Sequence, residues 1–161
     1  MIDTMQHKRL EISYTEYSSL AELEPSDREL AEAAIDAMKG SYSPYSRFRV
    51  GAAVRLSGGG IVKGANQENS AFPSGLCAER TAMFAASSWY PDEDMTAIAI
   101  AGGLEGRLAP SPATPCGACR QVMAQYQHRS GKPMKVLMVA DGRIWSFEKV
   151  DDILPFIFDS I

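Results

Sequence analysis

Three cysteines are the residues of this chain whose type and spacing best suit chemistry. Cys77 stands alone, whereas Cys116 and Cys119 form the pair in the segment PCGAC. An odd number of cysteines, in a chain whose first residues show no apolar leader, disfavours a disulfide framework and favours metal binding or catalysis. Cys77 and Cys116 each stand at the start of a predicted helix, where partial positive charge favours the thiolate, the form that binds zinc.

Three thiolates leave one position of a tetrahedral zinc ion without a protein ligand. An open position is typical of a catalytic zinc site, whereas structural sites are closed by four protein ligands. The two histidines of the sequence, His7 and His128, lie in the polar N-terminal segment and near the far end of a predicted helix. The open site is therefore preferred. The alternative is a closed, non-catalytic zinc module that takes His7 or His128 as its fourth ligand.

Charged residues flank the cysteines in the sequence. Glu79 lies two positions after Cys77, and at a helix start the two side chains can converge. A carboxylate beside the open metal position can accept and return protons, although acidic residues in a first helical turn also serve simply as dipole partners. Because three thiolates carry more charge than zinc offsets, Arg80 and Arg120 are candidates for compensating that charge, with a solvated helix face as the alternative.

The elements that position these residues are predicted from periodicity and turn signals. Helices are expected over 25–39 (with a capping box of Ser26 and Glu29), 77–90 and 117–129, strands over 48–56, 61–66, 95–102, 134–140 and 143–147, and a helical start after 150. This order predicts an α/β fold, a three-layer α/β/α domain with one mixed five-stranded sheet. Residues 1–24 are read as an N-terminal extension, with a possible extra edge strand at Leu10, Ile12 and Tyr14, and 25–161 as the catalytic domain.

Composition limits the partners of the chain. The net charge is −4 and the isoelectric point is near 5.2, so electrostatic binding of nucleic acid is not expected. The longest apolar stretches are too short to cross a membrane, and we expect a cytoplasmic protein. A small, uncharged or weakly polar substrate fits this balance best.

Four segments together carry a resemblance to a known family. They are YSPYSRFRVGAAV, GANQENSAFPSGLCAERTA, SPATPCGACRQV and DDILPFIF. With them, most of residues 26–159 resembles the zinc-dependent cytidine deaminases of the small three-cysteine type, with Cys77 in the histidine position of the H-x-E signature. The resemblance implies one zinc ion per chain and a homotetramer with its sites near subunit interfaces.

The resemblance also implies roles for individual residues. Zinc ligands are implied at Cys77, Cys116 and Cys119, and a proton shuttle is implied at Glu79. Asn66 and Glu68 are implied to contact the ribose hydroxyls, Phe48 to pack on the pyrimidine, and the main chain of Ala78 to read the base amide edge. Phe158 is implied to contact the site of a neighbouring subunit. The plainer alternatives are a turn residue for Asn66, a solvated charge for Glu68, core packing for Phe48 and a docked C-terminal tail for Phe158. Arg49 is expected beside the base pocket.

The implied reaction is hydrolytic deamination of cytidine and 2′-deoxycytidine to uridine and 2′-deoxyuridine, with release of ammonia, in pyrimidine salvage. A deaminase of another cytosine-bearing nucleoside is an alternative, which the pair Asn66 and Glu68 disfavours. A polynucleotide deaminase is a second alternative, which the acidic isoelectric point disfavours.

Overall fold

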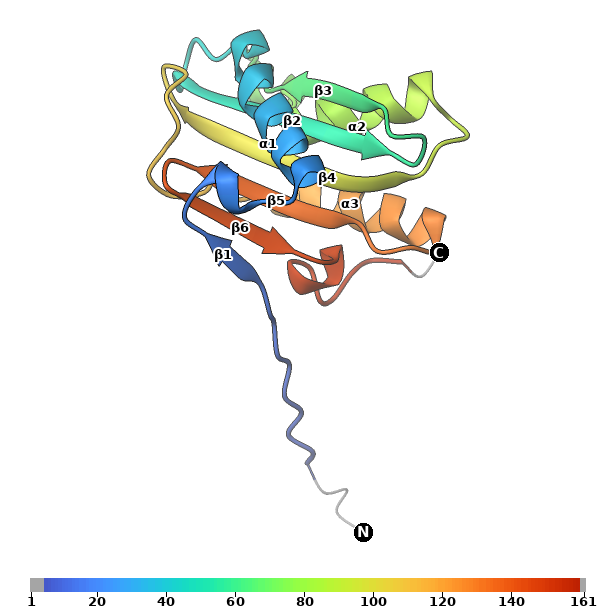
Figure 1. Ribbon diagram of the computed structural model, residues 1–161. Coiled ribbons are helices and arrows are strands. Elements are labelled where there is room, and N and C mark those ends of the chain that lie inside the picture. The colour runs from blue at the N-terminus through green and yellow to red at the C-terminus, as the bar shows by residue number, and fades with distance from the viewer. Residues whose placement is uncertain (1–4, 160–161) are drawn as a thin grey trace.

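A computed structural model of the chain describes residues 5–159 and shows one mixed sheet between two layers of helices (Figure 1). The strands of the described chain are β1 Thr15–Tyr17, β2 Phe48–Leu56, β3 Ile61–Ala65, β4 Met95–Leu104, β5 Lys135–Ala140 and β6 Arg143–Phe147; the α-helices are α1 Pro25–Ala37, α2 Ala78–Trp89 and α3 Gly117–Ser130. Their order across the sheet is β1-β6-β5-β4-β2-β3. Among these pairings β4–β5 is parallel, and α3 makes the crossover between the two strands.

The apolar run of β4 explains why helices cover both faces of the sheet. Side chains alternate along a strand, and here both sets are buried. Ile98 and Ile100 belong to the core under α2 and α3, whereas Ala99 belongs to the core under α1. The predicted three-layer α/β/α architecture is confirmed. None of the helices in the described chain has both the length and the apolar character needed to cross a membrane.

The sheet has six strands rather than the five predicted for the domain. The additional strand is β1, which lies within the N-terminal extension and pairs antiparallel with β6. The ring of Tyr14 stacks on Phe147 with centroids 5.2 Å apart, and the indole N–H of Trp145 donates to Glu16 at 2.6 Å. An edge strand is therefore present before Pro25, but it is formed by Thr15–Tyr17. The expectation that Leu10, Ile12 and Tyr14 belong to it is wrong, because these residues precede the paired segment.

The predicted capping box of α1 is wrong. The N-cap is Glu24, and no side chain caps the helix. Pro25 occupies the first helical turn, where its fixed φ suits the helix and its missing N–H costs nothing. Ser26 is consequently already inside the helix and cannot serve as its cap.

Gly64 of β3 allows α2 to lie close to the sheet. A Cβ atom added at this position would come within 2.4 Å of the main-chain nitrogen of Ala82 in α2. We expect Gly64→Ala to lower the free energy of unfolding by about 1–3 kcal/mol, because the helix must move away. Urea unfolding of this variant would be compared with that of Gly60→Ala, whose added Cβ would approach only a leucine methyl at 3.8 Å. Equal stability of the two variants would contradict this account of the packing.

Candidate metal and substrate site

The three cysteine sulfurs come together at the starts of two helices. Cys77 is the N-cap of α2, Cys116 is the N-cap of α3, and Cys119 lies in the first turn of α3. The three Sγ atoms lie within 4.8 Å of one another, and those of Cys77 and Cys116 are 3.9 Å apart. Tetrahedral zinc with Zn–S bonds of about 2.3 Å requires S···S distances of about 3.8 Å. The cluster therefore fits one zinc ion, and no histidine of residues 5–159 belongs to it.

The thiols of this cluster influence each other's protonation. The hydrogen bond to Cys119 lowers the pKa of Cys77 to about 5, with Arg80 and Cys116 acting in the same direction against partial burial. The same hydrogen bond and burial raise the pKa of Cys119. Negative charge therefore resides first on Cys77, the sulfur that faces a guanidinium.

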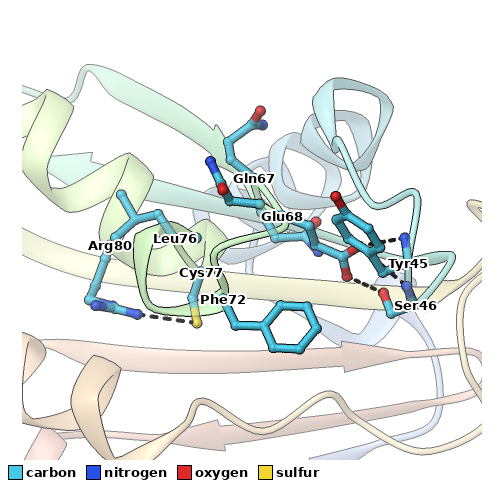
Figure 2. A pocket seen from close by; sticks show the side chains of 11 residues that line it. Tyr45, Ser46, Gln67, Glu68, Phe72, Leu76, Cys77 and Arg80 are labelled. Carbon is cyan, nitrogen blue, oxygen red and sulfur yellow. Dashed lines mark hydrogen bonds between the residues drawn. The ribbon is translucent and has the colours of Figure 1, made fainter.

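The two arginines near the cysteines differ in what they contact. One Nη of Arg80 donates to Cys77 Sγ at 3.6 Å (Figure 2), and its Nε is buried without a hydrogen-bond partner among the described residues. Arg120 instead donates to the main-chain carbonyls of Pro115 and Ile153, both at 2.8 Å. Within residues 5–159 Arg120 makes no hydrogen bond to a sulfur. Compensation of thiolate charge by direct donation thus rests on Arg80.

Glu79 is a buried carboxyl beside the sulfurs. It lies in the first turn of α2, and only 4% of its surface is exposed. Burial raises the pKa of Glu79, and negative charge on Cys77 acts in the same direction. A hollow of about 320 Å³ is lined by this carboxyl together with Phe48, Asn66, the fully buried Ala78 and two of the cysteines. The structure thus brings most of the predicted site residues to one cavity.

A wider groove of about 670 Å³ adjoins this hollow, sharing Asn66 and Cys77 in its lining. Glu68 and the ring of Phe72 line the groove, as Figure 2 shows. Of these two cavities, the smaller hollow is the one lined by Glu79. A molecule larger than a pyrimidine ring has room to extend into the groove.

The hydrogen bonds of Asn66 fix the orientation of its amide. The Oδ1 atom accepts from the N–H of Val50 at 2.9 Å and from the hydroxyl of Ser41 at 2.5 Å. The amide nitrogen donates to the carbonyl of Phe48 at 3.0 Å. Since an amide oxygen has two lone pairs and the nitrogen has two N–H groups, one N–H is left for a ligand.

The carboxylate of Glu68 is held by the neighbouring loop. Its Oε2 accepts from the N–H groups of Tyr45 at 2.9 Å and Ser46 at 3.2 Å, and its Oε1 accepts a short hydrogen bond from the Ser46 hydroxyl (Figure 2). The Ser46 hydroxyl is the main cause of a lowered pKa of Glu68, so this group is an anion at neutral pH. Its Oε1 atom retains a lone pair for a ligand.

Two residues of the sequence analysis lie away from the hollow. Arg49 lines a depression with Glu32 and Asp36 on the α1 side, because it alternates with Phe48 along β2; the expectation that it lies beside the base pocket is wrong. Phe158 is 67% exposed, and its main chain exchanges two hydrogen bonds with the side chain of Gln121. A contact of Phe158 with a neighbouring subunit stays a prediction.

The sequence analysis missed the hydroxyl groups that hold the polar pair. Ser41 and Ser46 contact Asn66 and Glu68 across 25 and 22 positions of sequence. The available signal was the density of hydroxyl residues in SYSPYS, directly before a strand that leads into the site. The partners of these hydroxyls depend on the fold and could not be read from that signal.

Comparisons with known proteins agree with this geometry. The model of the family described as "cytidine and deoxycytidylate deaminase zinc-binding region" matches residues 24–131. A cytidine deaminase of Halalkalibacterium halodurans is 47% identical over 96 residues, which is 60% of this chain and 68% of that protein. One from Sporosarcina psychrophila is 46% identical over 86 residues, 53% of this chain and 59% of that protein.

Solved structures of cytidine deaminases are also similar to this chain. The crystal structure of a cytidine deaminase from Burkholderia pseudomallei superposes with a TM-score of 0.70 at 37% identity, over 81% of this chain and 97% of that one. That of a cytidine deaminase from Mycobacterium tuberculosis gives a TM-score of 0.64 at 33% identity, over 82% of this chain and 96% of that one.

Proposed function

This chain belongs to the zinc-dependent cytidine and deoxycytidylate deaminase family, and we propose that it hydrolyses cytidine and 2′-deoxycytidine to uridine and 2′-deoxyuridine, releasing ammonia. The observation that carries the proposal is the single hollow that holds three clustered thiols and a buried carboxyl beside Asn66. We further propose one zinc ion per chain and a role in pyrimidine salvage in the cytoplasm. The direct test is to incubate the purified protein with cytidine and to measure ammonia and zinc per chain on the same sample.

Zinc held by Cys77, Cys116 and Cys119 would supply a Lewis acid that lowers the pKa of water towards neutrality. The chain's own groups then handle the protons. Glu79 accepts a proton from the attacking water and delivers it to ring N3, which makes C4 electrophilic. The same carboxyl then takes the remaining proton from the hydroxyl now attached to C4 and passes it to the amino group, so that the C4 carbonyl forms as ammonia leaves. A carboxyl whose pKa is raised by burial suits this double use, because it takes up a proton more readily than an exposed glutamate does.

Two residues of the hollow are proposed to place the base. Phe48 at the start of β2 packs on the pyrimidine ring, and the main chain of Ala78 reads its amide edge. Both belong to rigid elements, since Ala78 is the first residue of α2. A base held in this way presents C4 towards Glu79 and the sulfurs.

The sugar is proposed to be read through one hydroxyl. Asn66 has one N–H left to donate, and Glu68 has one lone pair left on Oε1, so together they match a hydroxyl that accepts from the amide and donates to the carboxylate. In 2′-deoxycytidine this hydroxyl is the 3′ group. Loss of the 2′ hydroxyl is then tolerated, which supports both proposed substrates.

We expect 2′,3′-dideoxycytidine to be a much poorer substrate than 2′-deoxycytidine. Without the 3′ hydroxyl the carboxylate of Glu68 and the N–H of Asn66 lose their partner, and kcat/KM should fall by about 10²-fold or more. Steady-state assays on cytidine and on both analogues check this, with free cytosine as a further comparison. Similar kcat/KM values for the deoxy and dideoxy compounds would exclude the pair from sugar recognition.

Assembly into a homotetramer is proposed as well. Large apolar side chains stand exposed beside the groove and in the C-terminal segment: Phe72 is 78% exposed, Phe156 86% and Phe158 67%. Exposed apolar side chains of this size are commonly covered by a partner. Light scattering coupled to size-exclusion chromatography measures the number of chains directly.

A further inference from the structure

The segment 41–47, called the serine loop below, runs beside the residues that face the sugar. Tyr42 donates its N–H to the carbonyl of Asn66 at 3.0 Å, and its own carbonyl accepts from the N–H of Glu68 at 2.8 Å. Tyr42 and Gln67 thereby form a parallel bridge. The serine loop is therefore fixed to the main chain of both sugar-facing residues, and its side chains are within reach of theirs.

Ser46 connects Glu68 to the strand that carries the base-packing ring. Its hydroxyl donates to the carboxylate and accepts from the N–H of Phe48 at 3.0 Å. The direction of both bonds is settled by chemistry, because an ionised carboxylate only accepts and a main-chain N–H only donates. With the N–H groups of residues 45 and 46, three donors hold this one carboxylate.

Ser41 holds the side chain of Asn66 as Ser46 holds that of Glu68. Its hydroxyl donates to Oδ1, the atom that also accepts from the N–H of Val50. The amide oxygen is thereby filled, and only the N–H side can address a ligand. One serine thus leaves Asn66 only its N–H for a ligand, and the other holds the Glu68 carboxylate, which can only accept, in one orientation.

We propose that Ser46 and Ser41 are positioning residues that set the sugar specificity of the site by orienting the acceptor Glu68 and the donor N–H of Asn66 towards a single hydroxyl. The proposal rests on the proposed function, since it concerns the same substrate. It differs from a purely structural role of the serine loop, which would affect all substrates alike. It also explains how Asn66 and Glu68, which line an open groove, can discriminate between sugars with and without this hydroxyl. Their hydrogen bonds to the protein fix the two side chains before the ligand binds.

The test compares Ser46→Ala with the unaltered protein on 2′-deoxycytidine and on 2′,3′-dideoxycytidine. For 2′-deoxycytidine we expect kcat/KM to fall roughly 10- to 100-fold, mainly through KM, because a hydrogen bond to a charged group is lost. For the dideoxy compound, which gives the pair nothing to bind, the fall should stay below about 3-fold. Ser46→Thr keeps the hydroxyl and should restore most of the discrimination. Ser57→Ala, in the β2–β3 turn, is the matched control and should change neither value.

The outcomes are distinguishable. Equal losses on both substrates, or no loss on either, would overturn the positioning role while leaving the deaminase activity in place. Ser41→Ala gives an independent variant: it should also lower kcat/KM selectively on the substrate with the hydroxyl. Thermal unfolding of each variant separates these effects from misfolding. An unaltered, zinc-loaded protein that releases no ammonia from any nucleoside would instead refute the proposed function, and this proposal with it.

Discussion

Glu79→Gln is expected to retain zinc and to lose turnover of cytidine by about 10³-fold or more. General acid–base groups contribute about 10²- to 10⁴-fold, and here a single carboxyl is proposed to serve both as base and as acid. Glutamine has nearly the same shape, so the buried first turn of α2, where only 4% of the Glu79 surface is exposed, should keep its packing. The amide can neither accept the proton of water nor deliver it to the ring.

The measurement is kcat for cytidine together with zinc per chain on the same preparation. Glu32→Gln, on the exposed side of α1, is a matched control and should leave both values unchanged. A Glu79→Gln protein that turns over cytidine at the unaltered rate would refute the proton-shuttle role. A variant without zinc would show instead that this carboxyl helps to form the metal site.

Replacement of Cys116 is expected to abolish both metal binding and activity. Cys116 is an exposed N-cap, so Cys116→Ser disturbs no core packing while it removes one of three thiolates. Two sulfurs do not hold zinc against dialysis, and turnover should fall by at least about 10³-fold. Added zinc at about 1,000 times its Kd should stabilise the unaltered protein by about 4 kcal/mol and the variant by much less.

Metal analysis after dialysis and thermal unfolding with and without zinc check this expectation. The double variant His7→Ala/His128→Ala serves as the control that separates the open site from the closed alternative. His128 lies in the last turn of α3, and neither histidine should be needed for the metal. Zinc loss in this double variant, or full zinc retention in Cys116→Ser, would contradict the three-sulfur site.

Much of this architecture could be predicted because it follows from local patterns. The helices and hairpins follow from periodicity and turn residues, and the cluster follows from two cysteine-bearing helix starts. Their meeting point depends on β4, whose continuous apolar run predicts a strand buried on both faces. The local signals for helices and strands agree with the tertiary fold of this chain, and the fold could therefore be predicted from the sequence.

What could not be predicted depends on contacts between distant segments. The carbonyl partners of Arg120 follow from where residue 153 lies, which the sequence does not show. The same holds for the hydroxyl of Ser46, whose carboxylate partner lies 22 positions away. Sequence identifies such polar residues, whereas their hydrogen bonds are set by tertiary structure. The place of Arg49, by contrast, could have been inferred, because neighbouring residues of a strand face opposite sides of the sheet.

The edge strand β1 has a consequence for how molecules of this protein meet one another. Its three residues cover the outer hydrogen-bonding groups of β6, and Tyr14 shields the ring of Phe147. A chain that began at Pro25 would leave β6 bare, and an uncovered, partly aromatic strand is a template for intermolecular strand addition and aggregation. We therefore expect a chain without residues 1–24 to aggregate more readily than the full chain, through the side of the sheet opposite to β3.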